Sequence, residues 1–174
     1  MTCIRRCADE DAFAVGILIA ETFRAFNLSY APPAEQELLL GPFRHARSSD
    51  DAHRQAVAEL IQAPTVLVAE VDSRIVGVLR GSPGRLHSLF VDAGYQGRGI
   101  GRELVESFEQ ECQRKGVTKI TLASSLYAVR FYQRLGYKRS TGLRHGPCFD
   151  GNGFPTQPMK KILSEARDLQ PGVH

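Results

Sequence analysis

The stretch of sequence that decides the fold runs from residue 86 to residue 101 and reads LHSLFV-DAGY-QGRGIG. Its hydrophobic first part is the end of a strand that we expect over residues 85–91. Its glycine-rich last part opens a helix that we expect over residues 101–115. This helix is amphipathic, because four apolar side chains recur on one face: Leu104, Val105, Phe108 and Cys112.

The three alternating glycines of this stretch predict a binding site for a bulky anion. Glycine has no Cβ, so the backbone at Gly97, Gly99 and Gly101 can approach a ligand closely. The first N–H groups of a helix have no intrahelical acceptor, and the helix dipole adds positive potential there. We therefore expect a pyrophosphate on this turn, with Arg98 and Arg102 at its rim.

The glycine spacing separates this turn from two other nucleotide-binding motifs. A dinucleotide-binding turn needs G-x-G-x-x-G, whereas residues 97–101 read G-x-G-x-G. A P-loop needs a Lys followed by Ser or Thr, and none follows here. The spacing therefore disfavours a nucleotide-dependent kinase or dehydrogenase. A glycine-rich turn without any ligand remains the alternative.

The elements around this stretch predict an α+β fold with a mixed, mostly antiparallel sheet and helices on both faces. Gly and Pro residues and changes in hydrophobic period set the expected boundaries. In chain order we expect strand 2–8, helix 9–26 capped by Asp9, a short helix 34–40, a helix from the Ser48–Asp50 cap to Gln62, an antiparallel meander of strands 65–71, 74–80 and 85–91, helix 101–115, strand 118–123, helix 127–135 capped by Ser124 or Ser125, and strands 137–145 and 156–163. We expect one domain over residues 2–163 and a polar tail over 164–174.

The composition favours a small anionic ligand over a nucleic acid or a membrane. There are 22 Lys and Arg residues and 19 Asp and Glu residues, a net charge of +3, which is far from a dense basic stripe. The longest apolar run is too short to span a bilayer. The four cysteines have neither metal-ligand nor disulfide-framework spacing, so we expect no metal site and reduced thiols in a cytoplasmic protein: Cys3, Cys7, Cys112 and Cys148.

Two motifs resemble those of the GNAT (GCN5-related) N-acetyltransferase superfamily. Gln96-x-x-Gly99-x-Gly101 resembles its acetyl-CoA motif, Q/R-x-x-G-x-G/A. Residues 128–137, AVRFYQRLGY, resemble its second cofactor helix, often A-x-x-F-Y-x-x-x-G-F. In one departure, Ser125 stands where the family often has Asn, so a cofactor contact and a pure capping role are both open for it. The resemblance covers roughly residues 2–163.

The resemblance implies transfer of an acetyl group from acetyl-CoA to an amine. In the family the pantetheine arm lies like an added strand between two splayed strands. Here the backbone groups of Leu89 and Val91 would pair with it, and Phe90 would lie between them. The expected cofactor-binding residues are Leu89, Phe90, Val91, Gln96, Gly97, Arg98, Gly99, Ile100, Gly101, Arg102, Ser125 and Ala128.

Two further residues are expected to carry the chemistry. Tyr132 is at the family's general-acid position, and its phenol is protonated at neutral pH and able to donate to the departing sulfur; simple packing under the cofactor is the alternative. His87 is the expected base. Residues of a strand alternate between faces, so His87 should share one side with Leu89 and Val91. Glu70 or an ordered water could act instead.

The resemblance implies that the amine acceptor binds between two segments, residues 23–47 and residues 146–155. They contain mixed aromatic and polar side chains, which suit a small-molecule or peptide amine: Phe26, Tyr30, Phe43, His45, Cys148, Phe149 and Asp150. The assembly state is open, a homodimer included. The alternative function is a non-catalytic acyl-CoA-binding regulatory module, which would not need Tyr132.

Overall fold

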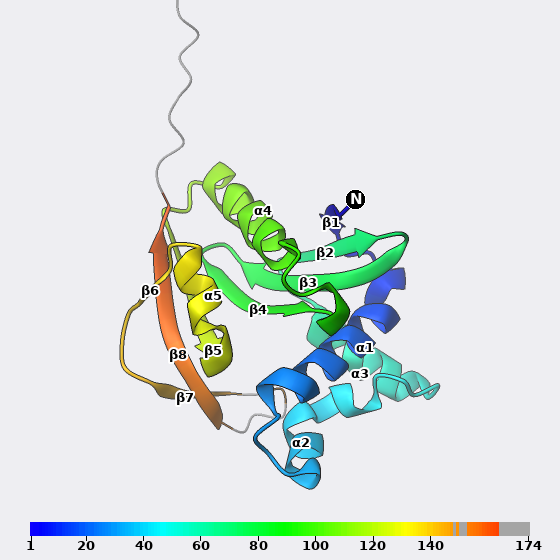
Figure 1. The fold of residues 1–174 in the computed structure, drawn as a ribbon. Coiled ribbons are helices and arrows are strands. Elements are labelled where there is room, and N and C mark those ends of the chain that lie inside the picture. Colours follow the sequence, from blue (N-terminus) through cyan, green and yellow to red (C-terminus); the bar gives the residue numbers. More distant parts are fainter. Residues whose placement is uncertain (148, 150–152, 164–174) are drawn as a thin grey trace, which may run out of the picture.

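The computed structural model describes residues 1–147, 149 and 153–163. Its strands form one sheet in the order β1-β2-β3-β4-β5-β8-β6, and β7 pairs with β8 (Figure 1). All neighbours in the described sheet are antiparallel except β4 and β5. The strands are β1 (Cys3–Arg6), β2 (Thr65–Val71), β3 (Arg74–Ser82), β4 (Arg85–Val91), β5 (Lys119–Ser125), β6 (Lys138–Arg139), β7 (Arg144–Pro147) and β8 (Gly153–Ile162). The expected α+β class and mostly antiparallel sheet are confirmed.

Helices cover both faces of the sheet (Figure 1). One face carries α1 (Ala12–Thr22), α2 (Pro33–Leu40) and α3 (Asp51–Ile61); the other carries α4 (Ile100–Arg114) and α5 (Val129–Arg134). Short 3-10 turns are η1 (Asp9–Asp11), η3 (Gly41–His45), η4 (Ala93–Tyr95) and η5 (Leu126–Ala128), and α1 continues into a π-helical turn, η2 (Phe23–Asn27). No described helix is both long and apolar enough to span a bilayer.

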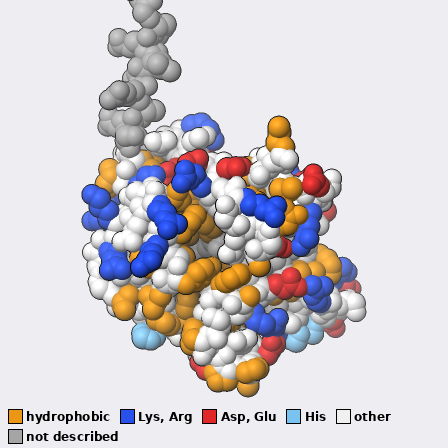
Figure 2. Space-filling view, viewed as in Figure 1, with side chains coloured by type: hydrophobic (Ala, Val, Ile, Leu, Met, Phe, Trp, Pro, Cys, Tyr) orange, Lys and Arg blue, Asp and Glu red, His pale blue; other side chains and the backbone are white. Residues whose placement is uncertain are grey.

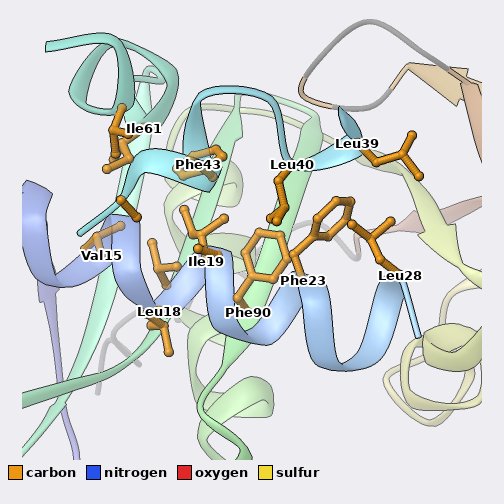
Figure 3. Close-up of a cluster of buried hydrophobic side chains, with 14 of the residues drawn as sticks. Val15, Leu18, Ile19, Phe23, Leu28, Leu39, Leu40, Phe43, Ile61 and Phe90 are labelled. Carbon is orange, nitrogen blue, oxygen red and sulfur yellow. The ribbon is translucent and has the colours of Figure 1, made fainter. Parts of the chain in front are cut away.

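The sheet separates two hydrophobic clusters because strand side chains alternate between faces. Figure 3 shows the cluster under α1, in which Phe23 of the π-helical turn and Phe90 of β4 meet, with ring centroids 6.0 Å apart. The cluster on the other face contains the predicted apolar stripe of α4, which is confirmed: Leu104, Val105, Phe108 and Cys112 are all buried.

Of three helix termini predicted from the sequence, the caps at Asp50 and Gly116 are confirmed and the cap at Asp9 is wrong. The Asp50 carboxylate accepts the backbone N–H groups of Ala52 and His53 at 2.9 and 3.2 Å, as an N-cap does. Gly116, with φ of +73°, follows the end of α4. Asp9 does not cap the first helical segment. The cap position is Ala8, whose N–H donates to the carboxylate of Asp11 at 2.8 Å.

The expected strand over residues 137–145 is split in the structure. Arg139 pairs with Met159 and Arg144 with Thr156, so this chain has more residues between the two pairs than β8 has. The extra residues form an unpaired loop between β6 and β7 (Figure 1). Pro158 of β8 has no N–H to donate at this point, and the Gln157 amide instead donates to the Thr141 carbonyl at 2.7 Å. The last strand also begins earlier than expected, at Gly153, and the expected tail lies outside the described residues.

Candidate active site

A cleft opens in the middle of the sheet because its two central strands diverge. β4 and β5 run parallel and pair at a single described position, Arg85 with Thr121. Beyond that pair the gap holds two adjoining cavities, with volumes of about 340 and 400 Å³. We name them the glycine-side pocket and the arginine-side pocket. Leu89, Tyr127, Ala128 and Tyr132 line both, so the two pockets form one continuous cleft.

The glycine-side pocket lies at the N-terminus of α4. Gly97 and Gly99 have φ of +74° and +88°, a conformation that favours glycine. Gly99 is the N-cap of α4 and supplies no side chain, so the first N–H groups of the helix have no side-chain cap. A Cβ on Gly101 would lie 3.2 Å from the Phe131 ring, so this glycine permits the close packing of α4 against α5.

Contacts of Asp92, Tyr95 and Arg98 hold the loop between β4 and α4 in place. Asp92 accepts the Gly94 N–H at 2.8 Å and forms an ion pair with Arg74 at 2.8 Å. The guanidinium groups of Arg98 and Arg74 lie over the Tyr95 ring, 5.0 and 5.7 Å from its centroid. The glycine turn is therefore fixed in place from the β4 side.

One edge of β4 faces the cleft with backbone groups that β3 does not use. The N–H of Asp92 donates to Val76 on β3, whereas the carbonyl of Val91 accepts the Gln96 side-chain amide at 3.0 Å. Neighbouring residues in an antiparallel ladder alternate in the direction of their backbone groups. Val91 and Leu89 therefore present their N–H and C=O groups toward the gap, where a chain-like ligand with amides could pair with them.

Two arginines border the glycine-side pocket. Arg102 and Arg134 line it, and the described residues that line it include no Asp or Glu. Figure 2 shows Lys and Arg side chains gathered over α5, which carries Arg134. Free helix N–H groups, two arginines and a glycine backbone together suit a pyrophosphate.

Tyr132 lies at the junction of the two pockets. It is 6% exposed, and no hydrogen bond to its hydroxyl is made by the described residues. Burial raises the pKa of this phenol above its ordinary value. Tyr132 is therefore protonated at neutral pH and available as a hydrogen-bond donor inside the cleft.

The comparison with known families agrees with this geometry. A family model described as the acetyltransferase (GNAT) domain matches residues 31–163, about three quarters of the chain. This chain belongs to the GNAT family. The resemblance drawn from the two motifs is confirmed.

Individual GNAT relatives are distant. The ribosomal protein bS18-alanine N-acetyltransferase of Escherichia coli is 36% identical over 70 residues, which is 38% of this chain and 47% of that protein. The chain spans between 28% and 57% of the length of the curated relatives it matches. The GCN5-related N-acetyltransferase structure from Rhodopseudomonas palustris has a TM-score of 0.73 at 21% identity, over 94% of this chain and 96% of that chain. The PaiA N-acetyltransferase from Thermoplasma acidophilum, solved with coenzyme A, has a TM-score of 0.65 at 16% identity, over 93% and 99%.

The structure brings most of the predicted cofactor residues of the GNAT motifs to the glycine-side pocket. Those that line it are Leu89, Val91, Gln96, Gly97, Gly99, Ile100, Gly101, Arg102 and Ala128, and the predicted acid Tyr132 lines it too. Arg98 lies instead over Tyr95, and Phe90 and Ser125 line the arginine-side pocket. The sequence reasoning missed Tyr95 and Arg134. The helical spacing of Arg134 after Phe131 could have indicated it, since residues three apart share a helix face.

Ser125 does not cap the helix in the way the sequence predicted. It is at the N-cap position of η5 but makes no side-chain capping hydrogen bond. The Ser124 hydroxyl donates to the Ser125 carbonyl at 2.8 Å and caps nothing either. The predicted cap position of Ser125 is therefore confirmed, but neither serine makes a capping hydrogen bond, and a ligand contact for Ser125 stays a prediction.

The predicted position of His87 on the face of Leu89 and Val91 is wrong. Leu86 pairs with Gly81 and Ser88 with Arg80, so β4 has one extra residue, His87, at a β-bulge. The bulge shifts the alternation, and Leu86 rather than His87 packs on the side of Leu89 and Val91. His87 is exposed at the rim of the arginine-side pocket, and its Nε2 is 3.0 Å from the Ser82 hydroxyl.

Glu70, the other residue considered as a base, does not line the cleft. It lies on β2, which β3 separates from β4. Its carboxylate accepts two hydrogen bonds from Arg5, at 2.8 and 2.9 Å. Glu70 is therefore a partner in an ion pair between β1 and β2 and lies too far from the cleft to act as the base.

The residues expected around the acceptor are spread over several places. Phe26 stacks on Tyr127, with centroids 6.0 Å apart, and Phe149 lines the arginine-side pocket. Phe43 is buried in the core, Tyr30 is exposed on the surface, and His45 stacks on His53 outside the cleft. Cys148 and Asp150 lie outside the described residues.

Proposed function

We propose that this protein is an acetyl-CoA-dependent N-acetyltransferase that moves an acetyl group to the primary amine of a small molecule or peptide by direct attack. The observation that supports the proposal is the divergence of β4 and β5, which pair only at Arg85 with Thr121 in the described structure. The glycine turn lies beside the opening that this divergence leaves. The two-part cleft leaves room for a cofactor on one side and an acceptor on the other, with Tyr132 between them.

The residues present fit acetyl-CoA. The uncapped start of α4, Arg102 and Arg134 would hold the pyrophosphate, and the free edge of β4 at Leu89 and Val91 would pair with the amides of pantetheine. Bound acetyl-CoA supplies an activated thioester carbonyl. Side chains of this protein carry out the proton transfers.

In the proposed reaction the amine nitrogen forms a bond to the acetyl carbon, and the carbon–sulfur bond breaks. Tyr132 gives its hydroxyl proton to the departing thiolate, whose thiol has an ordinary pKa of ~8.5. The alternative of a non-catalytic module is disfavoured by the position of Tyr132, because such a module would not need a protonated phenol between the two pockets.

The amine must lose a proton in order to attack. A lysine-like amine costs about 4.6 kcal/mol to deprotonate at pH 7, since its pKa of ~10.4 lies 3.4 units higher at 1.36 kcal/mol per unit. We propose that His87 receives this proton. Partial desolvation at the pocket rim and the nearby charges of Arg80 and Arg85 lower the pKa of His87 below its ordinary value, so its ring is neutral at pH 7 and can accept a proton.

Thermal unfolding with acetyl-CoA, CoA, ATP and NAD tests the cofactor assignment. Acetyl-CoA at a hundredfold excess over its Kd should stabilise the fold by about 2.7 kcal/mol. Release of thiol in the presence of a panel of amines then tests transfer. Stabilisation by ATP or NAD alone would overturn the cofactor assignment, and stabilisation by acetyl-CoA without transfer to any amine would favour the regulatory module.

A further inference from the structure

The arginine-side pocket has basic side chains and no acidic one among the described residues that line it. Arg80 and Arg85 lie on its wall beside His87. Neither arginine forms an ion pair with any described carboxylate. Some arginines elsewhere do have such partners, for example Arg5 with Asp11 and Arg74 with Asp92. The pocket therefore carries positive charge that the described part of the protein does not neutralise.

Arg80 is the more informative of the two arginines because it is partly buried and makes only neutral contacts. Its Nε donates to the Ile61 carbonyl at 2.9 Å, and its Nη2 to the Gln62 carbonyl at 3.4 Å, both at the end of α3. Its Nη1 lies 3.4 Å from the Ser88 hydroxyl. Burial lowers the pKa of this guanidinium, which remains charged all the same. Contacts to α3 account for only part of its five N–H donors.

A second polar group in the same pocket also lacks a partner. The Oδ1 atom of Asn27 is buried and has no described hydrogen-bond partner. Asn27 is the last residue of the π-helical turn, a type of distortion that is frequent at functional sites. Because an amide can be rotated to present either atom, Asn27 can accept from an amine or donate to an oxygen. Beside it, the rings of Phe23, Phe90, Phe149 and Phe154 give the pocket an apolar wall.

We propose that the acceptor amine carries a carboxylate close to its amino group, and that Arg80 and Arg85 bind this carboxylate in the arginine-side pocket. An α-amino acid with an apolar side chain meets these conditions. The N-terminus of a peptide does not, because its first carboxyl group is an amide. This inference rests on the proposed acetyl transfer and narrows its substrate class.

Three acceptors that differ in one group test the inference: phenylalanine, phenylalaninamide and 2-phenylethylamine. Thiol release is measured for each, and kcat/KM is expressed per concentration of neutral amine, because the three amines differ in pKa. Phenylalanine should exceed both others by at least tenfold. Equal values, or a preference for the amide, would overturn the inference while leaving the proposed function standing.

Two variants assign the preference to the arginines. Arg85→Gln, at an exposed position, and Arg80→Gln should each reduce the ratio of phenylalanine to 2-phenylethylamine by at least fivefold. Arg114→Gln, which removes the same charge from the exposed end of α4, should leave the ratio unchanged. A ratio that survives both pocket substitutions would overturn the assignment. Thermal unfolding checks that Arg80→Gln still folds, and Arg85→Gln supplies the test if it does not.

A binding measurement keeps the inference testable without turnover. In the presence of CoA, N-acetylphenylalanine should bind at least tenfold more tightly than N-acetyl-2-phenylethylamine. If acetyl-CoA binds but no amine of the panel, these three included, is acetylated, the proposed transfer fails, and the product pair alone decides whether the pocket selects a carboxylate. Equal binding of the two products would overturn that selection.

Discussion

Tyr132 and Tyr137 lie edge to face in one hydrophobic cluster, with ring centroids 5.7 Å apart and ring planes at 73°. Burial raises the pKa of both phenols. The two differ in position, since Tyr132 lines both pockets and Tyr137, which is 1% exposed, lines neither. They therefore form a matched pair of which only Tyr132 borders the cleft.

Removing the Tyr132 hydroxyl should abolish catalysis rather than binding. Tyr132→Phe is expected to lower kcat by ~10²–10⁴-fold, the usual contribution of a general acid. The Kd for acetyl-CoA should change by about tenfold at most, since one hydrogen bond contributes only ~1 kcal/mol. Tyr137→Phe removes the matching hydroxyl outside the cleft and should leave kcat within about twofold. Equal losses of kcat in the two variants would reduce Tyr132 to a packing residue.

Replacing Gly99 should prevent cofactor binding. Gly99→Val adds a side chain where the phosphates are proposed to lie, and the protein itself offers little hindrance, because the nearest atom to a Cβ is Glu103 Oε1 at 3.9 Å. The positive φ adds about 1–2 kcal/mol of strain. Gly116→Val is the control, because Gly116 has φ of +73° at the opposite end of the same helix and an open space around it.

Both glycine variants should lose similar stability, and only Gly99→Val should lose the stabilisation by acetyl-CoA. Titration calorimetry with CoA gives the affinities, and urea unfolding gives the stabilities. Normal CoA binding by Gly99→Val would show that the phosphates do not lie on this turn.

The cofactor side of the cleft could be predicted from sequence because its signals are local. A glycine at positive φ, an uncapped helix start and a second helix with Phe131 and Tyr132 are each specified within a few neighbouring residues. The fold class followed for the same reason, since period and turn residues locate strands and helices one at a time.

The acceptor side could not be predicted because its features depend on pairing between distant strands. The bulge at His87 exists only in the register of β4 against β3, and a one-residue shift reverses the direction of the following side chains. The Arg80 side chain is held at the cleft by hydrogen bonds to the end of α3, which lies about twenty residues away in the chain. The split of the strand after Tyr137 likewise depends on which residues of β8, Pro158 among them, stand opposite.

Asp11 is expected to contribute to stability in a pH-dependent way. Its carboxylate accepts two hydrogen bonds from Arg5, at 2.6 and 3.0 Å, and one from the Ala8 N–H. The Arg5 hydrogen bond holds the pKa of Asp11 below its ordinary value. A carboxylate with a lowered native pKa stabilises the fold above its unfolded pKa of ~3.9, and this contribution is lost as the pH falls through the native value.

Asp11→Asn should therefore cost about 1–2 kcal/mol at pH 7, the range for a charged hydrogen-bond partner after allowance for solvent screening. The difference from the parent should shrink below pH 4, as followed by urea unfolding. Glu21→Gln breaks an exposed ion pair with Arg47 and should cost no more than about 0.5 kcal/mol. A difference that is constant from pH 7 to pH 3 would contradict the electrostatic explanation.

The role of His87 as the base can be tested through the pH dependence of kcat/KM. The acidic limb of this profile should report His87 at a midpoint below 6.5, because partial desolvation at the pocket rim and the charges of Arg80 and Arg85 lower its pKa. Arg85→Gln removes one of these charges, so the midpoint should move up toward 6.5. Ser82→Ala removes the hydroxyl beside Nε2 and should move the limb without abolishing it.

His87→Ala should abolish the limb and lower kcat/KM at least tenfold near pH 7, with a much smaller effect above pH 9, where more of the amine is already neutral. The exposed position of His87 at a bulge favours a variant that still folds, and thermal unfolding checks this. If the profile of His87→Ala has the same shape as that of the parent, the proton goes to water instead. In that case His87 only shapes the rim of the pocket, and the acidic limb must come from the acceptor amine.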